Sequence, residues 1–117
     1  MMSDEADAEQ AAAERARQAV AAAEPALPTI LTQLTAMADP TRLELLIAID
    51  AIPDAPVKTL AAAIARSPNT VTQALAALAD AGLVQKTRDG RLSRWHLTDT
   101  ARLDLRHHLG QAPSHPD

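Results

Sequence analysis

The sequence predicts a mostly helical fold with one small β-hairpin, and two neighbouring segments carry most of that prediction. Ser67-Pro68 is a pairing typical of a helix N-terminus, and apolar residues then recur at helical spacing until Gly82 ends the helix. Directly after it, Leu83-Val84 opens a strand, Asp89-Gly90 supplies a hairpin turn, and residues 91–97 return with alternating character. A helix followed at once by a hairpin is the layout of a winged helix-turn-helix.

The first expected element is an alanine-rich helix over residues 6–23. Ten of these eighteen residues are alanine, the best helix former, but Val20 is the only large apolar anchor. Two interpretations of this weakly docked helix stay open: a solvated helix that frays, and a helix that flanks a dimer. We therefore expect an N-terminal extension over residues 1–27, one domain over 28–110, and a frayed tail over 111–117.

Three more helices are expected before Ser67, and one follows the hairpin. Apolar residues on one face predict a helix over residues 28–37. Asp39-Pro40 predicts the start of the next helix, which is apolar on most sides and should be buried centrally. Residues 58–65 form a brief helix, and the last helix runs over 99–109 behind a cap at residue 98 or 99. The expected order is helix-helix-helix-helix-helix-strand-strand-helix.

Composition narrows the function. A chain of 117 residues, 47% of them hydrophobic, suffices for one packed core. The absence of cysteine excludes disulfides and thiolate metal sites. An acidic start and short apolar runs argue against a secretory signal or a membrane span, so we expect a cytoplasmic protein. No glycine-rich phosphate loop and no recognisable nucleophile and base set occur, so we do not expect an enzyme.

The net charge of −4 is distributed unevenly. Residues 1–25 hold six acidic and two basic residues, and the remainder of the chain is balanced. The expected hairpin carries Lys86, Arg88, Arg91 and Arg94 against a single acidic residue. The positive field is therefore concentrated on the hairpin, where it can meet phosphate.

Four segments, in this order, resemble the ArsR/SmtB family of bacterial winged-helix repressors. They are residues 37–46 (MADPTRLELL), 67–73 (SPNTVTQ), 81–84 (AGLV) and 91–97 (RLSRWHL). Four ordered segments at family spacing are a more specific signal than a lone helix-turn-helix pattern. The resemblance implies a homodimer that binds operator DNA and that, in many family members, releases it when a metal ion or another signal binds. We expect dimerisation through the last helix and the N-terminal helix.

The resemblance assigns separate roles to the helix and the hairpin. Gln73 can make a bidentate contact to adenine, and its polar neighbours can contact bases or phosphates, while the basic hairpin residues grip the backbone. The expected DNA-binding residues are Pro68, Asn69, Thr70, Thr72, Gln73, Lys86, Arg88, Arg91 and Arg94. An alternative from another class is a winged-helix module that docks on protein without specific DNA binding.

Departures from the family pattern concern the sensing function. Of the four ligand positions of the family's site on the last helix, Asp99 and His115 retain ligand types. His107 and His108 are further candidates for nickel or zinc, although neighbouring helix residues point about 100° apart. Solvated histidines at a helix end are the alternative. Ala65 stands where the family turn has glycine, and we expect an altered turn that is still formed.

Overall fold

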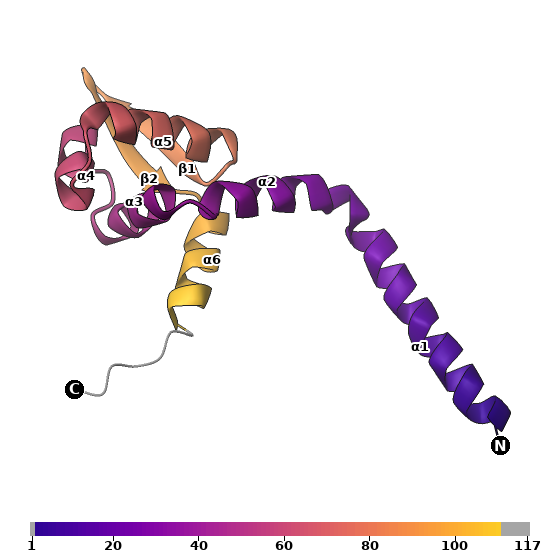
Figure 1. The fold of residues 1–117 in the computed structure, drawn as a ribbon. Coiled ribbons are helices and arrows are strands. Elements are labelled where there is room, and N and C mark those ends of the chain that lie inside the picture. Colours follow the sequence, from indigo (N-terminus) through magenta and orange to yellow (C-terminus); the bar gives the residue numbers. More distant parts are fainter. Residues whose placement is uncertain (1, 111–117) are drawn as a thin grey trace, which may run out of the picture. The chain divides into compact units, whose positions relative to one another are not determined.

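The computed structural model describes residues 2–110, which fall into two compact units that meet between Leu31 and Thr32 (Figure 1). The boundary between the units lies four residues after the one expected from the sequence, which followed residue 27. The tail expected over residues 111–117 lies outside the described residues. None of the described helices is long and apolar enough to cross a membrane.

The first unit is built from helix. It contains α1 (Met2–Ala23), the short 3₁₀ helix η1 (Glu24–Ala26) and the start of α2 (Leu27–Met37). All side chains from residue 4 to 23 are exposed. Alanine propensity explains the helix, and Glu14 and Arg17 add an ion pair one turn apart on its surface. The expected alanine-rich helix is therefore present and begins earlier than residue 6.

The second unit follows the expected order of elements (Figure 1). Its elements after α2 are α3 (Pro40–Ala51), α4 (Val57–Ile64), α5 (Pro68–Asp80), β1 (Val84–Asp89), β2 (Leu92–Leu97) and α6 (Asp99–Gly110). Asp39 caps α3, because its carboxylate accepts the N–H of Arg42 at 3.0 Å. This confirms the helix start expected at Asp39-Pro40.

The core of this unit gathers apolar side chains from every element after α2. The largest fully buried side chains are Leu45, Leu46, Ile49, Leu60, Val71, Leu75, Leu78, Leu83 and Leu105. Burial of α3 is less complete than expected, since Leu43 and Ile47 remain 37% and 39% exposed. Both line an apolar groove, whose full lining is Leu34, Met37, Ala38, Leu43, Ile47, Leu105, His108 and Leu109. We call this surface the α2–α3–α6 groove.

The hairpin pairs β1 with β2 antiparallel, with Val84 opposite Leu97 and Asp89 opposite Leu92. A further short piece of chain joins this sheet. The N–H of Trp95 donates to the carbonyl of Ala55 at 3.2 Å, and Trp95 accepts the N–H of Asp54 at 2.9 Å. The sequence analysis assigned no strand to this loop, because a two-residue pairing between prolines carries no alternation.

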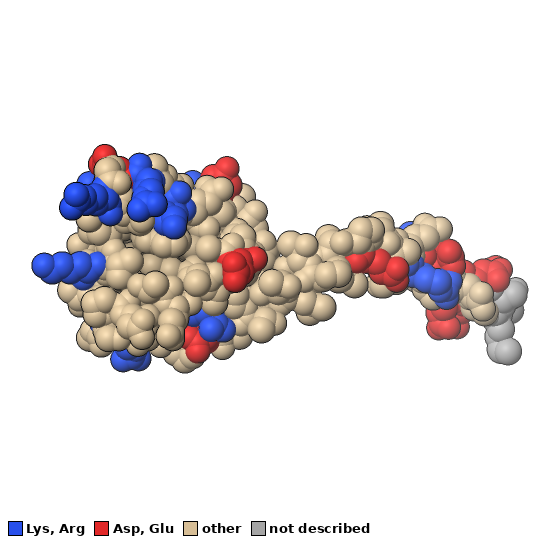
Figure 2. Space-filling model, turned by 90° about the horizontal axis from the view of Figure 1, so that it is seen from above, with Lys and Arg blue, Asp and Glu red and all other residues tan. Residues whose placement is uncertain are grey.

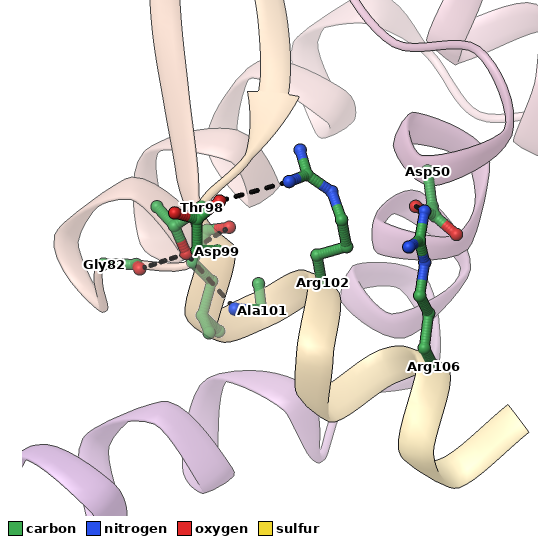
Figure 3. Close-up of polar contacts among 8 residues, drawn as sticks. Asp50, Gly82, Thr98, Asp99, Ala101, Arg102 and Arg106 are labelled. Carbon is green, nitrogen blue, oxygen red and sulfur yellow. Dashed lines mark hydrogen bonds and ion pairs between the residues drawn. The ribbon is translucent and has the colours of Figure 1, made fainter. Parts of the chain in front are cut away.

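Thr98 anchors α6 to the junction of α5 and β1 (Figure 3). Its hydroxyl donates to the carbonyl of Gly82 at 2.9 Å and accepts the N–H of Ala101 at 3.3 Å. Its own N–H donates to the carbonyl of Leu83 at 3.1 Å. The sequence allowed residue 98 or 99 as the cap of α6, and the Thr98 side chain makes the capping bond. The same hydroxyl joins α6 to the Gly82 carbonyl after α5.

We predict that Thr98→Val lowers the free energy of unfolding by about 1–3 kcal/mol. Valine has the shape of threonine but no hydroxyl, so the N–H of Ala101 and the carbonyl of Gly82 both lose their hydrogen-bond partner. Thr100→Val is the matched control, since Thr100 is exposed in the same helix, and should change stability by under about 0.5 kcal/mol. Urea unfolding measures both. Equal losses in the two variants would contradict the anchoring role.

Candidate nucleic-acid interface

Hydrogen bonds define the start of α5. Ser67 Oγ accepts the N–H of Thr70 at 3.1 Å, and the Ser67 hydroxyl also lies 2.9 Å from Thr70 Oγ1. Pro68 occupies the first helical position, where its missing N–H costs nothing. The cap expected from the sequence is confirmed. It holds the first turn of α5, where three of the five contact residues predicted on this helix lie.

The end of α5 is defined as firmly. The N–H of Leu83 donates to the carbonyl of Leu78 at 2.9 Å, and the N–H of Gly82 donates to that of Ala79 at 3.0 Å. Gly82 has a φ of +76°, which glycine adopts without a side-chain clash. This pair of bonds is a Schellman motif, and it turns the chain directly into β1.

The two sides of α5 differ sharply in exposure. Val71, Ala74, Leu75 and Leu78 are buried. The exposed side carries all five contact residues predicted on this helix, which are Pro68, Asn69, Thr70, Thr72 and Gln73. Because one stripe of the helix is committed to the core, the polar stripe faces solvent. Among the described residues, the amide of Gln73 has no hydrogen-bond partner within the chain.

The turn between α4 and α5 forms without the glycine that is usual in the family. Ala65 adopts the left-handed conformation, with φ 56° and ψ 47°. The N–H of Arg66 donates to the carbonyl of Ala61 at 3.1 Å and closes the end of α4. The turn is therefore retained, as expected, and the alanine carries a conformational cost of about 1–2 kcal/mol.

Three basic side chains of the hairpin are exposed and unpaired. Lys86, Arg88 and Arg91 make no ion pair with any residue between 2 and 110. Lys86 Nζ lies 5.8 Å from the centre of the Trp95 ring, a cation–π distance. In Figure 2, several basic side chains lie close together at the upper left edge of the winged-helix unit, and others lie apart from them. The group at this edge can offer positive charge to an anionic partner.

Arg94 differs from these three residues. Its Nη1 donates to the carbonyl of Asp54 at 3.2 Å, and its Nε lies 3.3 Å from Asp89 Oδ2. The neighbouring His96 is also directed at the loop, with Nδ1 3.6 Å from Asp54 Oδ1, which is too long for a hydrogen bond.

Among the residues expected to bind a metal, Asp99 lies apart from His107 and His108. Asp99 is 95% exposed and pairs with Arg102 at 3.1 Å (Figure 3). His107 and His108 contact each other edge to face, with ring centres 5.7 Å apart. They lie about 12 Å along α6 from Asp99, at the helical rise per residue. Residues 2–110 contain no group of three or more side chains able to hold a metal ion. His115 lies outside the described residues.

Two features of this unit were not expected from the sequence. One is the pairing of the Asp54-Ala55 loop with Trp95. The other is a polar hollow of about 260 Å³, to which α3 contributes Thr41 and α5 contributes Thr70 and Gln73. No short-range pattern marks Thr41, because its position beside α5 depends on how α3 and α5 pack.

Comparison with known families places the chain. The family model described as HVO_A0114 matches residues 37–99, which is more than half of the sequence. The chain belongs to this family. No match is found among curated proteins.

Solved structures share the fold. The homodimeric winged helix-turn-helix DNA-binding domain of Mb0332 from Mycobacterium bovis, a possible ArsR-family regulator, superposes with a TM-score of 0.71 at 22% identity, covering 81% of this chain and 88% of that one. HlyU from Vibrio vulnificus superposes with a TM-score of 0.68 at 21% identity, covering 80% of this chain and 98% of that one. A predicted DNA-binding transcriptional regulator from E. coli superposes with a TM-score of 0.66 at 24% identity, covering 80% of this chain and 96% of that one.

These likenesses confirm the winged helix-turn-helix fold and, at the level of fold, the resemblance to ArsR-type proteins. HlyU is a transcriptional regulator, Mb0332 is a possible one, and the E. coli protein is a predicted one.

We predict that Ala65→Gly raises the free energy of unfolding by about 1 kcal/mol, because glycine adopts the left-handed conformation without the alanine penalty. Ala76→Gly, at an exposed position within α5, is the control and should lower it by about 1 kcal/mol. Urea unfolding measures both variants. A loss of stability in Ala65→Gly would contradict the account of this turn.

Proposed function

We propose that the protein is a DNA-binding transcriptional regulator in which α5 reads bases and the hairpin contacts phosphates. One observation carries this proposal: an exposed polar stripe on a firmly capped helix continues directly into a hairpin with three unpaired basic side chains. Phosphate contacts position a protein on DNA, and contacts to base edges supply specificity. The two neighbouring surfaces match these two tasks.

The reading role falls to the first turns of α5. Gln73 presents a free amide, and glutamine pairs bidentately with the N6 and N7 atoms of adenine in the major groove. Asn69, Thr70 and Thr72 are short and exposed, so they can reach base edges or the flanking phosphates. Pro68 adds an apolar contact at the tip of the helix.

The gripping role falls to Lys86, Arg88 and Arg91. Each is exposed and has no acidic partner in the described chain, so its charge is available to phosphate oxygens. Such contacts release counterions and make DNA affinity depend on salt. The overall negative charge does not prevent this, because the acidic excess lies in residues 1–25.

We further propose that two copies act together through the α2–α3–α6 groove. Its lining includes Leu34 and Leu109, which are 54% and 48% exposed in the single chain. A second copy would cover this apolar surface and supply a second reading helix, so that paired half-sites lie about 34–36 Å apart. The described homodimeric state of Mb0332 supports the proposal.

Regulation by nickel or zinc stays a prediction from the family resemblance. The described part of α6 does not form a metal site by itself, because Asp99 is paired with Arg102 and lies far from His107 and His108. We therefore assign no step of regulation to a metal.

We predict that Arg88→Ala combined with Arg91→Ala weakens binding to every duplex and reduces the slope of log affinity against log salt by about two. Gln73→Ala is the contrasting variant. It should leave the slope unchanged and cost about 1–3 kcal/mol of discrimination between the operator and a scrambled duplex. Fluorescence anisotropy with DNA from upstream of the protein's own gene, at several salt concentrations, measures both effects.

An unchanged slope in the double variant would exclude the assignment of the hairpin to phosphate. Purely nonspecific binding by the unaltered protein would contradict the proposed function and favour a module that docks on protein.

We predict that Leu34→Glu converts the dimer to a folded monomer, because it places a charge in the covered apolar surface. Ala79→Glu, at an exposed position of α5, is the control and should leave the dimer intact. Sedimentation equilibrium measures the oligomeric state, and circular dichroism checks the fold. A dimer of unchanged affinity in Leu34→Glu would place the interface elsewhere.

A further inference from the structure

One arginine of the hairpin is held by the protein itself. The Arg94 guanidinium bonds the carbonyl of Asp54 through Nη1 at 3.2 Å and approaches the carboxylate of Asp89 through Nε at 3.3 Å. Asp54 lies in the loop between α3 and α4, and Asp89 is the last residue of β1. A single side chain therefore spans both strands of the hairpin and a loop forty residues away in sequence.

The loop that Arg94 contacts is joined to β2 by two backbone bonds as well. The N–H of Asp54 donates to the Trp95 carbonyl at 2.9 Å, and the N–H of Trp95 donates to the Ala55 carbonyl at 3.2 Å. Asp54 itself has a φ of +65°, which is uncommon for a residue with a side chain. Such a conformation persists only where the surroundings hold it. The bond from Arg94 to the Asp54 carbonyl is part of that hold.

The register also separates Arg94 from two of the free cations. Arg94 lies opposite Thr87, whereas Lys86 lies opposite Trp95 and Arg88 lies opposite Ser93. Residues directly opposite in an antiparallel pair share a face, and successive residues alternate between faces. Arg94 therefore lies on the face of the hairpin opposite to that of Lys86 and Arg88.

Arginine has the geometry for this task, since its planar guanidinium carries donors in a rigid fork and can serve a carbonyl and a carboxylate together. Lysine keeps the charge but not the fork. We infer that Arg94 is a positioning residue for DNA binding: it ties the hairpin to the α3–α4 loop so that Lys86, Arg88 and Arg91 are presented to phosphate. This inference rests on the proposed function for its DNA-binding consequence, but the tie itself exists in the free protein.

The first experiment uses the full chain without DNA. Amide hydrogen exchange of Asp54 and Trp95 is measured by NMR in the unaltered protein, in Arg94→Lys and in Arg91→Lys. Loss of a charge-assisted bond should speed exchange at both amides about tenfold in Arg94→Lys. Arg91→Lys is the matched control and should leave exchange unchanged. Unchanged exchange in Arg94→Lys would overturn the tie, whether or not the protein binds DNA.

The second experiment measures DNA affinity at several salt concentrations. We expect Arg94→Lys and Arg94→Ala to weaken binding by a similar factor, about tenfold, with an unchanged salt slope, because the charge itself is not the contact. Arg91→Ala should reduce the slope by about one, and Arg91→Lys should retain it.

A different pattern would identify a direct phosphate contact and overturn the inference: Arg94→Lys binds like the unaltered protein, and Arg94→Ala flattens the slope as Arg91→Ala does. If the unaltered protein does not bind DNA, the proposed function fails, while the exchange measurement still decides whether Arg94 holds the loop.

Discussion

Burial of one side of α5 is the constraint on which the rest of the winged-helix unit depends. Val71, Leu75 and Leu78 are fully buried and commit this stripe of the helix to the core. The hydrophobic effect is not directional, but a helix with one apolar stripe can bury that stripe against the core in only one orientation. The polar residues of the first turns must then face solvent. The packed core and the exposed polar surface of α5 are two consequences of the same orientation.

Polar anchors turn that orientation into a defined geometry. Ser67 caps the start of α5, the bonds at Gly82 end it, and Thr98 ties the start of α6 to the same junction. Each anchor satisfies backbone groups that the end of a helix would otherwise leave unpaired. Hydrogen bonds therefore define the start of α5, its end and the start of α6. Arg94 extends this arrangement to the α3–α4 loop.

Charge is organised locally in this protein. The negative total comes from the N-terminal segment, whereas the hairpin retains free cations after Arg94 has been engaged by Asp54 and Asp89. Charges separated by more than about 8–10 Å in solution are largely screened at physiological salt, so the local field decides which partner a surface attracts. The overall pI of about 5.5 is therefore a poor guide to the partner of the hairpin.

The sequence by itself determined the element order, the caps at Asp39 and Ser67, and the exposed stripe of α5, because these depend on spacing and on contacts within a few residues. Only the tertiary structure decided that the backbone of Asp54 pairs with Trp95 and that its carbonyl accepts a hydrogen bond from Arg94. It also decided that Leu43 and Ile47 line an open groove. The physical reason is range. A helix cap or an amphipathic stripe depends on residues that are close in sequence. The bond from Arg94 to Asp54 joins residues forty positions apart, so it depends on how whole elements pack.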